Sequence, residues 1–166
     1  MINITLYRIE DKQFWKGQPK AAFRREARWH SEGRKVIYTS RLASLAVLEW
    51  LKGFISSNVE VSGLYDRHFV LWHADFLLNE PLAEIDPSAL SSDWWRVPAW
   101  KSRDTQQLGN KWIDEKRSLI LRVPSSAVPS GMGWNYLIDP EHTDFDRALQ
   151  QSTVAETHFN FQHYLG

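Results

Sequence analysis

The chain has 166 residues, a length typical of one domain with a buried core. Its 20 lysines and arginines balance 20 acidic residues, which argues against a general nucleic-acid-binding protein, because such proteins carry surplus cations. It has no cysteine, no segment resembling a signal peptide and no apolar run of about 18 residues, which together favour a cytoplasmic protein without a membrane span.

The N-terminal part of the chain predicts two strands followed by one helix. The first strand is expected over Thr5–Ile9 and the second over Val36–Thr39, a short β-branched and aromatic run. The polar residues 11–33 between them predict a loop or a short helix. Ser40 is expected to cap the N-terminus of the helix, which ends near Gly53.

One face of this predicted helix combines apolar residues with a carboxylate. Positions i, i+3, i+4 and i+7 of the face are Leu42, Leu45, Ala46 and Glu49. A solvated glutamate normally lies on the opposite face of such a helix. The spacing therefore predicts that Glu49 points toward the interior.

The rest of the chain predicts further strands and shorter helices. Strands are expected over His68–Leu78, Leu119–Val123, Asn135–Ile138 and His158–Phe161. Helical segments are expected near 88–95, over Leu108–Asp114 and over Asp144–Gln151. Because strands and helices mix without regular alternation, the predicted fold class is α+β.

Four residues have the chemistry that a site needs to bind a nucleotide and break a bond at its ribose: Arg28, Tyr38, Glu49 and Ser125. The guanidinium of Arg28 suits bidentate phosphate contact, and the ring of Tyr38 could stack on a flat heterocycle. The Glu49 carboxylate, in a pocket of low dielectric, could stabilise positive charge developing at an anomeric carbon. Ser125 follows a predicted strand, where its hydroxyl could contact phosphate or ribose.

Each of these residues also has a purely structural interpretation. Glu49 could form a core ion pair with Arg28 or Arg41. Tyr38 could fill the core as other strand aromatics do, and Ser125 could be an ordinary turn serine. The residue types alone leave both interpretations open.

Several other kinds of site are not supported by the sequence. His68 and His73 are five residues apart, which fits neither a helical pair nor a finger spacing, and no metal site is expected. There is no P-loop and no Gly-x-Gly-x-x-Gly motif, and no serine lies in a Gly-x-Ser-x-Gly elbow.

Short motifs in a specific order lie along nearly the whole chain: Leu6-Tyr7-Arg8-Ile9, Arg28-Trp29, Val36-Ile37-Tyr38-Thr39-Ser40, Leu45-Ala46-Val47-Leu48-Glu49, Val123-Pro124-Ser125 and Asn135-Tyr136-Leu137-Ile138. In these motifs the chain resembles the RES-domain toxins of bacterial RES–Xre toxin–antitoxin pairs, a family named for arginine, glutamate and serine. The resemblance implies that residues 1–166 form a single RES domain with a fold similar to ADP-ribosyltransferases of the diphtheria-toxin type.

The resemblance also implies an activity and a partner. The substrate would be NAD, whose nicotinamide–ribose bond is cleaved by phosphorolysis with inorganic phosphate, without a metal. Arg28, Tyr38 and Glu49 would match the catalytic residues of the family, and Ser125, with Arg28 and Tyr38, would bind the substrate. The partner would be an Xre-type helix-turn-helix antitoxin in a hetero-oligomer, and DNA would be contacted only through that antitoxin.

The chain departs from the family pattern at two places, and two other functions stay open. Glu26-Ala27 stands where small, glycine-like residues are usual, and Asp139 stands where asparagine is usual. A carboxylate close to a bound phosphate would be unfavourable. The alternatives are a protein ADP-ribosyltransferase using the same cleft and an inactive module that binds a partner through a tryptophan-rich surface.

Overall fold

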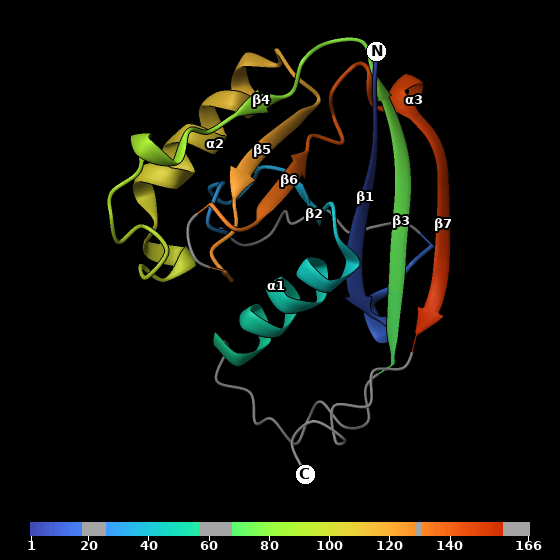
Figure 1. Ribbon diagram of the computed structural model, residues 1–166, viewed down its shortest axis with the longest axis horizontal. Coiled ribbons are helices and arrows are strands. Elements are labelled where there is room, and N and C mark those ends of the chain that lie inside the picture. Colours follow the sequence, from blue (N-terminus) through green and yellow to red (C-terminus); the bar gives the residue numbers. More distant parts are fainter. Residues whose placement is uncertain (18–25, 57–67, 129–130, 158–166) are drawn as a thin grey trace.

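The computed structural model describes residues 1–17, 26–56, 68–128 and 131–157 (Figure 1). Its strands are β1 (Ile2–Asp11), β2 (Ile37–Ser40), β3 (Phe69–Leu78), β4 (Ala83–Glu84), β5 (Ile120–Pro124), β6 (Trp134–Ile138) and β7 (Leu149–Thr157). Its α-helices are α1 (Ala43–Ser56), α2 (Arg103–Glu115) and α3 (Phe145–Ala148). The predicted strand over His158–Phe161 lies outside the described residues.

The strands form one sheet in the order β4-β5-β6-β2-β1-β3-β7. All neighbours are antiparallel except β4 and β5. Helix α1 packs against β1 and β2, whereas α2 lies beside β4 and β5 at the other end of the sheet (Figure 1). This mixture of an antiparallel sheet and separate helices confirms the predicted α+β class.

Buried side chains form two hydrophobic clusters, and β6 contributes to both because its residues alternate between the faces of the sheet. Tyr136 and Ile138 belong to one cluster, and Leu137 between them belongs to the other. The second cluster also contains three buried tryptophans, which are Trp29, Trp94 and Trp112. For these three rings, core packing is the observed role.

Most predicted strands are confirmed, although β1 is longer than expected and α2 begins five residues before the predicted segment. The helix expected near 88–95 is wrong: only Pro87–Ala89 forms a short 3-10 helix, and turns follow it. The segment 11–33 contains the expected short helix, a 3-10 turn over Lys12–Phe14.

The predicted cap at Ser40 is also wrong. Ser40 is the last residue of β2, and its hydroxyl donates to Oδ1 of Asn135 at 2.7 Å. Helix α1 begins only at Ala43, so Leu42 precedes it and is 63% exposed. On the predicted face, Leu45 is buried and Glu49 is half-buried.

The predicted helix over Asp144–Gln151 is the largest error. Only Phe145–Ala148 is helical, and β7 begins at Leu149 and pairs along the length of β3. The long edge of β3 supplies backbone partners for these residues. Pairing with this edge outweighs a weak local helical preference.

Helix α2 fixes the segment that contains Arg28. Oγ1 of Thr105 donates to the Arg28 carbonyl oxygen at 2.5 Å, and Nε2 of Gln106 donates to that of Ala27 at 2.9 Å. At Gly109 the helix lies so close to the segment that a β-carbon would lie 1.8 Å from the Trp29 carbonyl oxygen. Only glycine permits this contact between two backbones.

We therefore expect Gly109→Ala to lower the free energy of unfolding by about 3 kcal/mol, because neither backbone can yield without breaking these hydrogen bonds. Gly53→Ala is the control: Gly53 is exposed in α1 with nothing near its missing β-carbon. That change should instead stabilise the protein by about 0.5–1 kcal/mol. Urea denaturation measures both, and equal stability of the two variants would contradict this packing.

Candidate active site

The Glu49 carboxylate joins three elements of the fold. Its Oε1 atom accepts hydrogen bonds from Oγ of Ser125 and from Nδ2 of Asn135, both at 2.5 Å. Ser125 directly follows β5 and Asn135 lies in β6, and both are buried. Within the described part of the chain, Oε2 has no hydrogen-bond partner. One oxygen of this half-buried carboxylate is thus fixed by two hydrogen bonds, and the other makes none to the described residues.

Both donors to Glu49 are themselves fixed. The Ser125 N–H donates to the Gly133 carbonyl at 2.9 Å, and Oγ of Ser125 also accepts from the N–H of Ala127 at 3.1 Å. Oδ1 of Asn135 accepts from Ser40, which orients its amide so that the NH₂ group faces Glu49. Such a network holds the carboxylate in one position before a ligand binds.

Arg28 is anchored by neutral acceptors. Nη1 donates to the Trp94 carbonyl at 2.7 Å and to Oγ of Ser102 at 3.1 Å, and Nη2 donates to the Val97 carbonyl at 2.8 Å. These bonds use three of the five guanidinium N–H groups, so two remain without an acceptor among the described residues. Burial lowers the pKa of Arg28, and the nearby charges of Glu49 and Tyr38 oppose this effect.

Tyr38 lies on β2 with its ring packed against the second hydrophobic cluster. Its hydroxyl contacts Nδ1 of His30 at 2.8 Å and accepts from the Trp29 N–H at 3.3 Å. Burial raises the pKa of the phenol, so the hydroxyl is neutral at physiological pH. The Tyr38 ring therefore packs against the core, as its structural interpretation predicts, and its hydroxyl also contacts the segment that contains Arg28.

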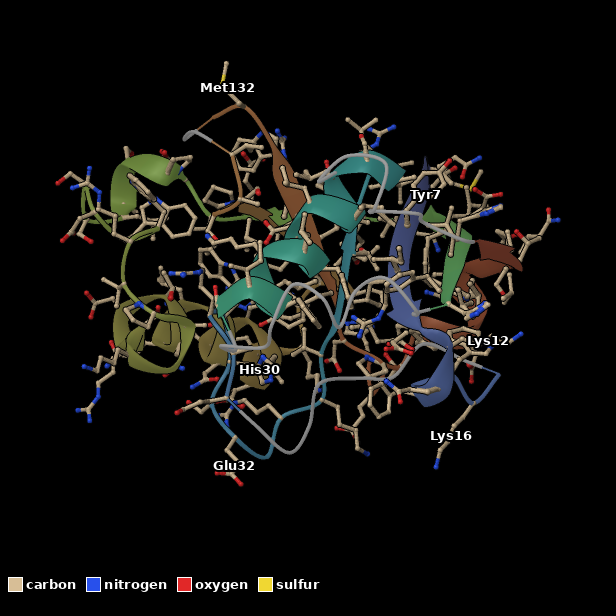
Figure 2. All side chains as sticks on the ribbon, turned by 90° about the horizontal axis from the view of Figure 1, so that it is seen from below. Tyr7, Lys12, Lys16, His30, Glu32 and Met132 are labelled. Atoms are coloured by element: carbon tan, nitrogen blue, oxygen red, sulfur yellow. The ribbon has the colours of Figure 1, made fainter. Side chains whose placement is uncertain are left out.

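The structure brings the four predicted residues together to different degrees. Glu49 and Ser125 are in direct contact, and Arg28 and Tyr38 interact with Glu49 electrostatically without a hydrogen bond. No ion pair of Glu49 with Arg28 or Arg41 occurs within the described ranges, so the predicted ion-pair alternative for Glu49 is wrong. In the view of Figure 2, His30 and Met132 lie on opposite sides of α1.

Two polar residues of the site had no predicted role. Asn135 belongs to a recognised motif, but only the fold shows that it contacts Glu49. Lys52 follows Glu49 by three residues, a spacing that places both on one helix face and could have indicated it. Its ammonium donates to the carbonyl oxygen and, at 2.9 Å, to the hydroxyl of Ser126.

The unusual carboxylate at Asp139 does not lie in this site. Asp139 follows the end of β6, whereas Asn135 is near its beginning. Asp139 is buried and pairs with Nζ of Lys116 at 2.5 Å, and it also accepts from the Glu141 N–H. Its charge is therefore balanced by a local lysine.

Among the described residues, no three histidine or acidic side chains are grouped as metal ligands would be. In the same part of the chain, none of the helices combines the length and the apolar character that crossing a bilayer requires. The chemistry of the site thus consists of a carboxylate, two cations, a phenol and neutral hydrogen-bond donors.

Comparison with known proteins assigns the chain to a family. The model of the RES domain matches residues 5–162. The chain belongs to the RES domain family. It is 30% identical to "Toxin Res" of Photorhabdus laumondii over 160 residues, covering 94% of this chain and 93% of the relative. It is 28% identical to "Toxin Res" of Yersinia enterocolitica over 162 residues, covering 95% and 97% of the two chains.

Two further comparisons concern a more distant relative and a solved structure. The "Prs ADP-ribosylating toxin" of Sphingobium is 29% identical over 120 residues, covering 70% of this RES domain chain and 68% of that protein. The MbcT–MbcA toxin–antitoxin complex of M. tuberculosis contains a chain with a TM-score of 0.69 and 16% identity, covering 93% and 85%. The predicted family is confirmed, and the solved complex contains a chain with the same overall fold.

The anchoring of Arg28 predicts that substitutions of this residue affect stability as well as function. Arg28→Ala leaves the Trp94 and Val97 carbonyls without their donor, and we expect a loss of about 1–3 kcal/mol in the free energy of unfolding. Arg96→Ala is the matched control, because Arg96 lies between Trp94 and Val97, is exposed, and stacks on the Trp95 ring without a side-chain hydrogen bond to the described residues. That change should stay within about 0.5 kcal/mol of the wild type.

Thermal and urea denaturation of the two arginine variants measure this difference. A variant Arg28→Ala as stable as the wild type would show that the three hydrogen bonds contribute nothing. Loss of activity in that variant could then be assigned to substrate contact alone.

Proposed function

We propose that this RES domain, residues 1–166, cleaves the nicotinamide–ribose bond of NAD and is the toxin of a toxin–antitoxin pair in the cytoplasm. The observation that supports the reaction is the Glu49 carboxylate, held through Oε1 by Ser125 and Asn135 with Oε2 unbonded in the described residues. A preorganised, half-buried negative charge is what stabilises a developing ribosyl cation. The family match and the relatives named "Toxin Res" support the toxin role.

In the proposed reaction, the bond between the nicotinamide nitrogen and the anomeric carbon of the ribose breaks. Both bonding electrons leave with nicotinamide, which becomes neutral, and the ribose acquires oxocarbenium character. The Glu49 carboxylate stabilises this positive charge electrostatically. An oxygen of inorganic phosphate then attacks the anomeric carbon and gives ADP-ribose 1″-phosphate.

The other predicted site residues position the nucleotide. The two N–H groups of Arg28 that have no acceptor in the described residues can bind the pyrophosphate or a ribose hydroxyl. Tyr38 presents a neutral aromatic ring on which nicotinamide can stack. Ser125 donates to Glu49, and its hydroxyl can also contact the ribose of a nucleotide bound beside that carboxylate.

A protein side chain is the second candidate for the acceptor of the ADP-ribosyl group. The relative from Sphingobium supports it, since that protein is named an ADP-ribosylating toxin. The same cleft and the same bond cleavage serve both reactions. Incubation with NAD labelled in its adenylate separates them, because transfer labels a protein band and phosphorolysis labels only a small product.

The proposed partner is an antitoxin that covers the cleft. The solved complex of similar fold contains a toxin with its antitoxin, and the relatives are named as toxins. We propose an Xre-type helix-turn-helix protein for this role, with DNA bound only through it and with both proteins in a hetero-oligomer. Co-expression with the product of an adjacent gene tests this assembly.

The central test replaces the charge of Glu49 and preserves its hydrogen bonds. In Glu49→Gln the amide oxygen can accept from both Ser125 and Asn135, because both bonds end on the same atom. We expect the rate of NAD loss to fall about 10²–10³-fold, with the melting temperature nearly unchanged. Mass spectrometry of the products, with and without phosphate, identifies the acceptor.

Glu32→Gln is the control for this measurement, because Glu32 is an exposed carboxylate in the turn that precedes β2. It should retain full activity. Undiminished NAD loss in Glu49→Gln would contradict the role of this carboxylate. A wild-type protein that neither consumes NAD nor labels a protein would favour the inactive binding module.

A further inference from the structure

The hydrogen bonds of Lys52 have no role in the proposed cleavage of NAD by Glu49. It lies one helical turn after Glu49 on α1, and its half-buried ammonium donates to the carbonyl and hydroxyl oxygens of Ser126. Both acceptors are neutral. An ammonium has three N–H groups, so one is left without an acceptor among the described residues. The Ser126 hydroxyl accepts from Lys52 and keeps its own proton for another acceptor.

The charges around Lys52 are not balanced. No carboxylate pairs with it in the described parts of the chain, since Glu49 is bonded to neutral donors and Arg28 to neutral acceptors. Burial lowers the pKa of Lys52, the positive charge of Arg28 lowers it further, and Glu49 opposes both effects. Two cations therefore interact electrostatically with one carboxylate and with each other, and a bound anion would relieve the repulsion between the cations.

We propose that Lys52 and Ser126 form a phosphate-binding subsite of the cleft. The remaining N–H of Lys52 and the Ser126 hydroxyl donate to the oxygens of one phosphate group. This inference rests on the proposed function, and the phosphate can come from two sources. One source is the pyrophosphate of NAD, and the other is the inorganic phosphate that attacks the ribose.

The alternative is that Lys52 only braces the turn that carries Ser125. The variant Lys52→Gln separates the two roles, because its amide NH₂ group can still donate to Ser126 but carries no charge. Lys52→Arg keeps the charge, and Lys52→Met removes both the charge and the donor. If Lys52 only braces the turn, Lys52→Gln should have the KM values of the wild type. If Lys52 binds phosphate, only Lys52→Arg should keep those KM values.

The experiment measures KM for NAD at saturating phosphate and KM for phosphate at saturating NAD. We expect Lys52→Gln to raise one of them about 10- to 100-fold, with the melting temperature unchanged and with rescue by Lys52→Arg. A rise in KM for NAD assigns the subsite to the pyrophosphate, and a rise in KM for phosphate assigns it to the attacking group. Lys111→Gln, an exposed lysine on α2, is the matched control.

The pH dependence gives a second readout that a brace would not change. Only the protonated ammonium attracts phosphate, so the affected KM should rise as the pH increases through the lowered pKa of Lys52. In Lys52→Arg this rise should disappear, because a guanidinium stays protonated over that range. If the affected KM depends on pH in the same way in the wild type and in Lys52→Arg, the proposal is wrong.

Failure of the subsite and failure of the proposed function give different results. If the wild type consumes NAD and Lys52→Gln leaves both KM values unchanged, the subsite is wrong and the NAD reaction stands. If the wild type consumes no NAD, the proposed function is wrong. Calorimetric titration with inorganic pyrophosphate then decides the subsite, because weaker binding by Lys52→Gln than by the wild type supports it and equal binding overturns it.

Discussion

The site depends on one interaction, the pair of hydrogen bonds that Oε1 of Glu49 accepts from Ser125 and Asn135. Through these bonds α1 is joined to the end of β5 and to β6, which lie far from it in sequence. The chemical nature of these donors also determines whether the carboxylate charge is compensated. Because the two donors are neutral, they do not compensate the charge of the Glu49 carboxylate, whereas a direct ion pair with an arginine would have compensated it.

A second constraint sets the position of Arg28. Helix α2 contacts the backbone of residues 27–31 directly, and Gly109 permits the two backbones to meet. The guanidinium then extends to the carbonyl oxygens of the 94–98 segment. Packing around Trp29 and Trp94 thus positions the Arg28 cation, and the hydrogen bonds from Ser125 and Asn135 position the Glu49 carboxylate.

Local patterns predicted the strands well, because β1, β3, β5 and β6 have β-branched or aromatic runs with clear ends. Local patterns failed where hydrogen bonding to a distant strand determines the secondary structure. Residues 149–151 follow a helical pattern, but they form a strand that pairs with β3. The same distinction holds for the site. Glu49 and Ser125 could be found from residue type and motif, but Asn135 lies 86 residues from Glu49, and only the folded sheet brings them together.

We expect the nicotinamide ribose of NAD to bind beside the Glu49 carboxylate. A crystal structure of the Glu49→Gln protein with NAD tests it most directly, because this variant should bind the substrate without cleaving it. We expect the anomeric carbon of that ribose to lie next to the side chain of residue 49, with the pyrophosphate toward Arg28. A nucleotide bound elsewhere, with its ribose away from residue 49, would contradict it.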